Sequence, residues 1–365
     1  MYDAAVIGTG DATTEPDTSG CAMGYAHGEG YKQNELCELV SCADLIEENR
    51  VRFGHKFDIS PSRTYDYHTK LLSAEQPEIV SVCTHPKVHF QIVIDCIETD
   101  SVQAVHCEKP MGHTLSDCHH MINVADQNDV QLTINHQRRF AGPVESVKEL
   151  LDRGKIGDVT RVELFTWTLY DYATHLFDLC GYFLDEPRAE WVFAQLDYSE
   201  ENIVFGAHNE NQAIVQWKYN NGVDGLAVIG DDVDMIDCLV RIIGTDGTIE
   251  MGRPEIDPPE RPTLRYRSTD TIGWKSVSCS EDCHGFSDQW PGYVDRAIDE
   301  VVDSFVTDRV PVLDAQNALH SMEIIFGAWE SARQRRRIQS PFDIDNNPLE
   351  EMVTSGELSP TPNEN

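Results

Sequence analysis

Positive charge is scarce in this 365-residue sequence. Lysine and arginine together number 28, of which nine are lysine, against 63 acidic residues, and the formal net charge is −35. Proteins that bind nucleic acid neutralise phosphates with clustered basic side chains, so we expect no nucleic-acid partner. An acidic surface repels itself at low salt, whereas molar salt shortens the Debye length to about 3 Å. We interpret the composition as adaptation to a salt-rich, halophilic cytoplasm; an ordinary acidic protein is the alternative.

Long apolar runs are also missing. No window offers the roughly 18 uncharged apolar residues of a membrane span. Residues 1 to 8 lead directly into a strand pattern, without the basic start and apolar core of a secretory signal. These absences predict a cytoplasmic protein with no membrane partner.

The cysteines lack the spacing of a disulfide or zinc framework. They number eleven, an odd count, and most stand inside apparent strands and helices, where they resemble small buried hydrophobic residues. The tightest pair, Cys279 and Cys283 with His284, has no second ligand pair, and His119 with His120 suits an exposed helix face. We therefore predict a reducing compartment and no metal site.

Residues 1 to 140 alternate apolar runs with helical patterns. The runs include "YDAAVIG", "CELVSCAD", "PEIVSVCT", "QAVHCEKP" and "DVQLTINHQ". This alternation predicts an α/β domain with a parallel, doubly wound sheet, whose ligands lie beyond the carboxyl ends of the strands. Gly8, Thr9 and Gly10 end the first run and Asp44 ends the second, as in a dinucleotide site where the acid accepts from the ribose. An unrelated glycine turn is the alternative.

Six motifs then follow one another in a fixed order. They are "GTG" at 8 to 10, Asp44, "THPKVHF" at 84 to 90, "EKP" at 108 to 110, "NHQRRF" at 135 to 140 and "DYATHLFD" at 171 to 178. In this order the chain resembles the Gfo/Idh/MocA family of nicotinamide-dependent oxidoreductases over most of its length. The resemblance implies a Rossmann domain over 1–140 and a second domain over 141–345 for substrate binding and oligomerisation.

The second domain is expected to hold a large open, mostly antiparallel sheet. "AIVQWKYNNGVDGLAVIG" predicts two strands joined by an Asn-Gly turn, and residues 313 to 338 resemble the family's C-terminal helix. The open sheet face implies a homodimer or homotetramer. Residues 346–365 are polar and acidic, so we predict a disordered tail.

The resemblance also implies the site residues. For catalysis they are Lys109, Asp171 and His175. His175 is the base, Asp171 orients the imidazole or holds a neighbouring hydroxyl, and Lys109 stabilises the alkoxide and assists proton transfer. The cofactor-binding residues are Gly8, Thr9, Gly10, Asp44, Thr84, His85, His89, Glu108 and Lys109. Arg138 and Asp178 are substrate-binding candidates, although a supporting salt bridge is nearly as good an interpretation of both.

Two departures from the family affect the site. About ten residues, "DATTEPDTSG" at 11 to 20, lengthen the glycine loop and add Asp11, Glu15 and Asp17. We expect this insertion to loop outward while a helix beginning near Gly20 supplies its positive N-terminus. The long loop that many members carry before the histidine motif is almost absent, so its substrate contacts cannot be transferred.

The implied function is an NAD-dependent dehydrogenase that acts on a secondary hydroxyl of a sugar, polyol or cyclitol. Asp44 favours NAD because a carboxylate repels a 2′-phosphate, while Arg50 and Arg52 nearby keep NADP open. Two alternatives use the same fold: an NAD-dependent glycoside hydrolase and a non-catalytic cofactor-sensing regulator. The second is disfavoured because a sensor needs no base.

Overall fold

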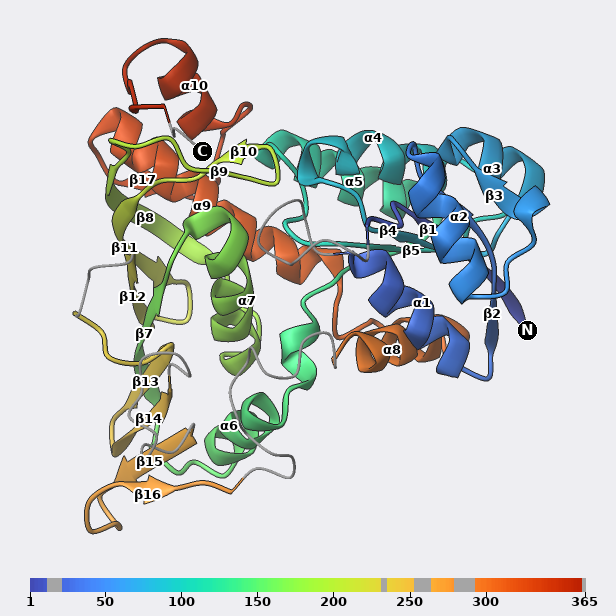
Figure 1. Cartoon of the computed structure of the whole chain (residues 1–365). Coiled ribbons are helices and arrows are strands. Elements are labelled where there is room, and N and C mark those ends of the chain that lie inside the picture. Colours follow the sequence, from blue (N-terminus) through green and yellow to red (C-terminus); the bar gives the residue numbers. More distant parts are fainter. Residues whose placement is uncertain (12–21, 231–234, 253–263, 279–292, 363–365) are drawn as a thin grey trace. The chain divides into compact units, whose positions relative to one another are not determined.

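The computed structural model describes residues 1–11, 22–230, 235–252, 264–278 and 293–362. The chain divides into two compact units (Figure 1). The first comprises Met1–Gln137, Phe205–Ala207 and Pro291–Leu319, and the second comprises Arg138–Val204, His208–Trp290 and His320–Asn365. Between Gln137 and Arg138 the chain passes from the first unit to the second, and the predicted domain bounds stay a prediction.

The first unit contains the predicted parallel sheet. Its six strands lie in the order β3-β2-β1-β4-β5-β6, and every neighbouring pair is parallel. The strands are β1 (Tyr2–Ile7), β2 (Cys37–Ala43), β3 (Thr64–Tyr65), β4 (Ile79–Val82), β5 (Ala104–Cys107) and β6 (Gln131–Ile134). The helices are α1 (Met23–Gln33), α2 (Glu47–Lys56), the 3-10 turn Pro61–Arg63, α3 (His68–Glu75), α4 (Pro86–Ile97), α5 (Leu115–Asn128) and α8 (Val294–Val306).

Apolar residues form the strands because both faces of the sheet are covered. Ala4, Val6 and Ile79 are fully buried, as expected for central strands of a doubly wound sheet. Helix α8 packs beside α1, where a Cβ on Gly30 would lie 2.8 Å from Ile298 Cγ1. The predicted second domain included this segment. The amphipathic pattern of α8 predicts that one face of the helix is buried, but it does not predict which sheet covers that face.

The second unit is built on a nine-stranded sheet in the order β16-β15-β14-β13-β7-β12-β11-β8-β17. Within this nine-stranded sheet, β12 and β7 are the only parallel pair among the described strands. The prediction of a mostly antiparallel sheet is therefore confirmed. Its strands are β7 (Val159–Thr166), β8 (Ala189–Asp197), β11 (Gln212–Tyr219), β12 (Asp224–Ile229), β13 (Val240–Gly244), β14 (Gly247–Met251), β15 (Leu264–Ser268), β16 (Lys275–Ser276) and β17 (Ile338–Gln339). A small hairpin, β9 (Ile203–Val204) and β10 (Ala207–His208), stands apart from it.

The remaining helical segments of the described chain belong wholly or mostly to the second unit (Figure 1). They are the 3-10 turn Gln137–Phe140, α6 (Gly142–Asp152), the π-helix Leu169–Ala173, α7 (Thr174–Phe183), α9 (Ala315–Gln334) and α10 (Pro348–Thr354). The predicted hairpin is confirmed, since β11 and β12 pair and Gly222 takes the positive φ of 89° that its turn requires. Helix α9 confirms the predicted C-terminal helix.

The prediction of a disordered tail is wrong for the described residues up to 362. Asn347 caps α10 by accepting a hydrogen bond from the Glu350 backbone N–H at 3.1 Å. Leu349 and Met352 are buried, so this short acidic segment has an apolar face that overall composition concealed. Across the described part of the chain, no helix has the length and apolar character needed to cross a membrane.

Candidate active site

The glycine turn after β1 has no room for a side chain at Gly8, nor has the facing helix at Gly24. Gly8 has a φ of +86°, and a Cβ there would lie 2.7 Å from Thr84 Cγ2. A Cβ on Gly24, in α1, would lie 2.7 Å from the Gly8 carbonyl oxygen. This close approach of strand, turn and helix fits a pyrophosphate held against backbone. Most of the insertion, including Glu15 and Asp17, lies outside the described residues.

Asp44 lies directly against this turn. Its Oδ2 accepts hydrogen bonds from the Thr9 backbone N–H and hydroxyl, both at 2.9 Å, and from the Gly10 backbone N–H at 3.1 Å. The carboxylate thus joins the carboxyl ends of β1 and β2, which are neighbours in the sheet. Asp44 therefore lies beside the glycine turn, and its contact with a ribose stays a prediction.

Thr84 and His85 follow strand β4, which ends at Val82. Thr84 Oγ1 is buried and has no hydrogen-bond partner among the residues that the structure describes, which fits a ligand hydroxyl or phosphate at this edge. His85 is exposed. His89 differs, because its ring is fully buried and its two nitrogens lie 2.9 Å and 3.0 Å from the Thr84 and Pro110 carbonyl oxygens. His89 therefore connects the turn at Thr84 to the turn at Pro110, next to Lys109.

Glu108, at the end of β5, lies in a buried hydrogen-bond network. Its Oε1 accepts from His27 Nε2 at 3.0 Å and from Asn135 Nδ2 at 2.7 Å. The other ring nitrogen of His27 lies 2.9 Å from Ser81 Oγ, which contacts the Tyr31 hydroxyl at 2.8 Å. Because an ionised carboxylate only accepts, Nε2 of His27 must carry a proton.

These donors decide the charge of Glu108. Burial alone would raise its pKa, but hydrogen bonds from His27 and Asn135 and the positive charge of Lys109 lower the pKa to about 2. Oε2 accepts from the Lys109 backbone N–H at 3.1 Å, so the network fixes the main chain at the lysine. The Lys109 ammonium lies 5.9 Å from the ring centre of Phe205.

In the second unit, Asp171 and His175 lie on one continuous helical segment. Asp171 belongs to the π-helix Leu169–Ala173, and His175 is the second residue of α7. Both side chains are buried, at 7% and 3% exposure. The four-residue spacing on this helical stretch keeps the two residues on neighbouring parts of its surface. Lys109 belongs to the first unit, so its meeting with His175 stays a prediction.

The substrate-binding candidates differ from each other. Asp178 forms a buried bidentate ion pair, because Arg139 Nε and Nη2 donate to its two carboxylate oxygens at 2.8 Å and 2.7 Å. Arg139 also donates to Glu186 at 2.7 Å. This geometry matches the supporting salt bridge considered for Asp178. Arg138 is half-buried in the 3-10 turn before α6.

Sequence reasoning missed His27, Asn135, Arg139, Phe205 and Glu210. Asn135 and Arg139 stand within the "NHQRRF" motif, which was a usable signal. His27 lies on the helix after the glycine turn, where a histidine among small residues hinted at a buried polar contact. Phe205 and Glu210 carried no local signal, because their partners are distant in sequence.

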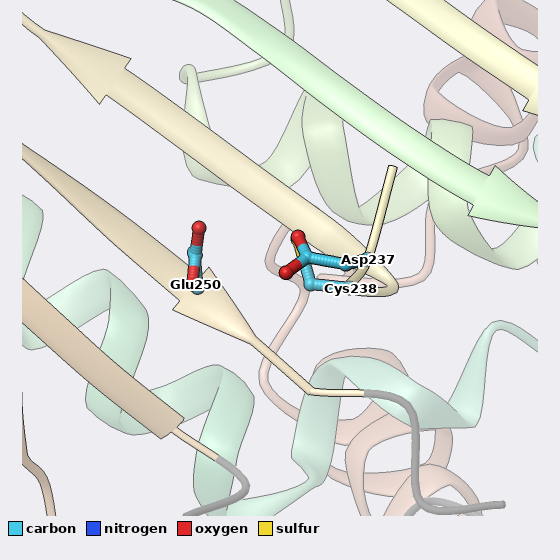
Figure 2. A group of neighbouring side chains, drawn as sticks. All are labelled: Asp237, Cys238 and Glu250. Carbon is cyan, nitrogen blue, oxygen red and sulfur yellow. The ribbon is translucent and has the colours of Figure 1, made fainter. Parts of the chain in front are cut away.

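Asp237, Cys238 and Glu250 come together beside β13 and β14, with ligand-type atoms within 4.8 Å of one another (Figure 2). Arginines already bind the two carboxylates: Arg241 donates to Asp237 and to Glu250, and Arg265 donates to Glu250 at 2.6 Å. We describe this group as an ion-pair network. The candidate set Cys279, Cys283 and His284 lies outside the described residues.

Family models match both halves of the chain. An NAD-binding Rossmann-fold model of the oxidoreductase family Gfo/Idh/MocA matches residues 3–136, and the C-terminal α/β domain model of the same family matches residues 148–339. The chain belongs to this family. It is therefore an oxidoreductase of the dehydrogenase type with an NAD-binding Rossmann domain.

Individual relatives are distant. The rhizopine catabolism protein MocA of Rhizobium meliloti is 22% identical over 62% of this chain and 74% of its own length. The inositol 2-dehydrogenase of Salmonella typhimurium is 25% identical, but the match covers 33% of this chain and 35% of that protein. These identities leave the substrate of the present protein open.

Solved structures share the fold. The WlbA dehydrogenase from Bordetella pertussis, in complex with NADH and UDP-GlcNAcA, has a TM-score of 0.73 at 18% identity, covering 94% of this chain and 98% of that one. An inositol dehydrogenase homologue from Azotobacter vinelandii, with NADH and myo-inositol, has a TM-score of 0.71 at 18% identity, covering 93% and 97%.

Proposed function

We propose that the protein oxidises a secondary hydroxyl of a sugar, polyol or cyclitol with NAD. The observation that carries this proposal is the pair Asp171 and His175 on one helical segment, in a family member that also carries Lys109 at the end of a Rossmann strand. Relatives named for inositol and D-apiose support this substrate class.

Each residue has a distinct task in this proposal. NAD, when bound, would supply the hydride acceptor, and the hydroxyl proton of the substrate must then pass to a base of the protein. His175 takes that proton, Asp171 orients the imidazole, and the Lys109 ammonium stabilises the negative charge that develops on oxygen. The buried Glu108 carboxylate accepts a hydrogen bond from the Lys109 backbone N–H and so fixes the main chain that carries this ammonium.

NAD is the proposed cofactor in preference to NADP. The Asp44 carboxylate at the glycine turn would repel a 2′-phosphate. Arg52 is engaged by two carboxylates, Asp11 at 2.6 Å and Glu48 at 2.8 Å, so a phosphate would have to displace them. An Asp44→Ser variant tests this proposal, because it should shift the ratio of NAD to NADP affinity toward NADP.

The deciding experiment follows nicotinamide absorbance with NAD and NADP, in molar potassium chloride, across inositols, pentoses, hexoses and their acids. We expect turnover with NAD and one substrate, abolished by Lys109→Ala or His175→Ala while the fold stays intact and, in His175→Ala, the cofactor affinity is unchanged. The exposed residues Lys70 and His55 supply matched controls as alanine variants. Unchanged turnover in both site variants would overturn the proposal. Tight NAD binding without any turnover would favour the hydrolase or the regulator.

We also propose a homo-oligomer in a salt-rich cytoplasm. Phe193 and Ile214 on the open sheet are 38% and 45% exposed, which suits burial against a second copy. Analytical ultracentrifugation in molar potassium chloride tests this assembly, and a monomer at micromolar concentration would contradict it.

The proposed salt adaptation is tested by unfolding curves at increasing potassium chloride. A free energy of unfolding that falls as the salt concentration rises would contradict it.

A further inference from the structure

Glu210 is a buried carboxylate next to the segment that carries Asp171. It is fully buried, and it stands just before β11. Its Oε1 accepts a hydrogen bond from the Leu169 backbone N–H at 2.7 Å, and its Oε2 accepts from the Trp329 indole N–H at 2.8 Å. Among the described residues Glu210 forms no ion pair, so both side-chain oxygens are hydrogen-bonded to neutral donors.

Leu169 is the first residue of the π-helix. The opening N–H groups of a helix have no partner within it, and a buried one must find an acceptor elsewhere. Glu210 satisfies the Leu169 donor, while Thr168 Oγ1 accepts from the Tyr172 backbone N–H at 3.3 Å. Asp171 lies within the turn that these two bonds fix, and His175 follows without a break.

The second bond of Glu210 ties this turn to α9. Trp329 is fully buried, and its ring centre lies 5.8 Å from Tyr170 and 5.5 Å from Phe326. Tyr170 belongs to the π-helix, so aromatic packing and the Glu210 hydrogen bonds hold the same turn from two sides. π-helices are rare, and they occur frequently at functional sites.

A carboxylate suits this position better than an amide. Two N–H donors face its two oxygens, and a glutamine would offer one oxygen and one NH₂ group. That NH₂ group would oppose one of the donors. The need for two acceptors accounts for an acid that is costly to bury without a cation.

We propose that Glu210 is a positioning residue, which holds the π-helical turn so that Asp171 and His175 meet the substrate in reactive geometry. This inference rests on the proposed function of those two residues. A displacement of about 1 Å in such a segment can lower turnover by about 100-fold.

The test is a double-mutant cycle on Glu210→Gln and Trp329→Phe. In Glu210→Gln, kcat should fall by about 100-fold, while KM and the affinity for NAD stay within about twofold. Trp329→Phe removes the indole N–H that would face the NH₂ group of the new glutamine. The kcat of the double variant should therefore be at least tenfold higher than that of Glu210→Gln alone. Glu323→Gln is the matched control, because Glu323 is a buried acid on α9 that contacts Arg188.

A readout that does not depend on turnover accompanies the cycle. Hydrogen exchange of the segment 169–175 should be at least tenfold faster in Glu210→Gln than in the wild type, and slower again in the double variant. Losses of kcat that simply add in the double variant, or unchanged exchange in Glu210→Gln, would overturn the inference. If Asp171→Asn and His175→Ala leave turnover intact, the proposed function fails instead, and the exchange result still decides whether Glu210 holds the turn.

Discussion

Each unit holds one buried glutamate beside predicted catalytic residues, and the two are stabilised by different means. Glu108 in the first unit accepts from a histidine and an amide and lies near a lysine, and its pKa is lowered to about 2. Glu210 in the second unit accepts from a backbone amide and an indole, and burial raises its pKa. Equal burial therefore produces opposite shifts, since the partners decide whether the charged form is favoured.

The two environments suit two tasks. Around Glu108, an acid that is ionised at neutral pH anchors the main chain of a lysine whose charge the reaction needs. Around Glu210, neutral donors fix a helical turn without adding a competing charge near Asp171. We therefore expect different losses of stability and turnover when the partners of each glutamate are removed.

The largest effect is expected for His27→Leu. This change leaves the Glu108 carboxylate buried without its histidine, which should lower the free energy of unfolding by about 3 to 5 kcal/mol. Removing both groups in His27→Leu/Glu108→Leu should restore much of that loss, because no unpaired charge then remains. Urea unfolding at pH 7 in molar potassium chloride measures both. A double variant as unstable as the sum of the single variants would refute the pairing.

Opposite pH dependences are the next largest effect. The unfolded state binds a proton at Glu108 more readily than the folded state, so this residue's contribution of roughly 3 kcal/mol is lost as the pH falls from about 4.5 to about 2. At Glu210 the folded state binds the proton more readily. Its contribution is therefore fully present below the ordinary pKa of 4.5 and is lost as the pH rises above that value.

Unfolding of the wild type, Glu108→Gln and Glu210→Gln across pH 2.5 to 7 separates the two cases. The stability advantage of the wild type over Glu108→Gln should shrink on acidification, and its advantage over Glu210→Gln should grow. Submicromolar protein limits precipitation near the pI of about 4.5. Two curves that change in the same direction would contradict the comparison.

How much of the fold and of the candidate site could be predicted from the sequence depends on how local each contact is. Gly8, Asp44 and Lys109 were predictable, because strand ends and short motifs mark the ligand edge of a parallel sheet. Glu210 was not, since its partners lie 41 and 119 residues away. The assignment of α8 failed for the same reason: its pattern shows an apolar face but not the helix that it meets.

A smaller effect is expected at the hydroxyl that shares the π-helical turn with Glu210. Thr168→Val keeps the shape of the side chain but removes the acceptor for the Tyr172 backbone N–H. Loss of such a cap costs about 1 kcal/mol. Turnover should fall less than in Glu210→Gln, because both hydrogen bonds of Glu210 remain. A larger loss of kcat in Thr168→Val than in Glu210→Gln would make the threonine the main support of the turn.

The smallest effect concerns salt. Potassium chloride between 0.2 and 3 M should stabilise the wild type, because it screens the repulsion within a surface of net charge −35. The coupling free energy between His27 and Glu108 should change by less than about 0.5 kcal/mol over the same range, since ions do not reach fully buried groups. The exposed Arg309, paired with Glu300 and Asp303, offers the contrast, and the effect of Arg309→Gln should weaken with salt. A buried pair as salt-sensitive as the exposed one would mean that water reaches Glu108, and the distinction between the two glutamates would then lose its physical basis.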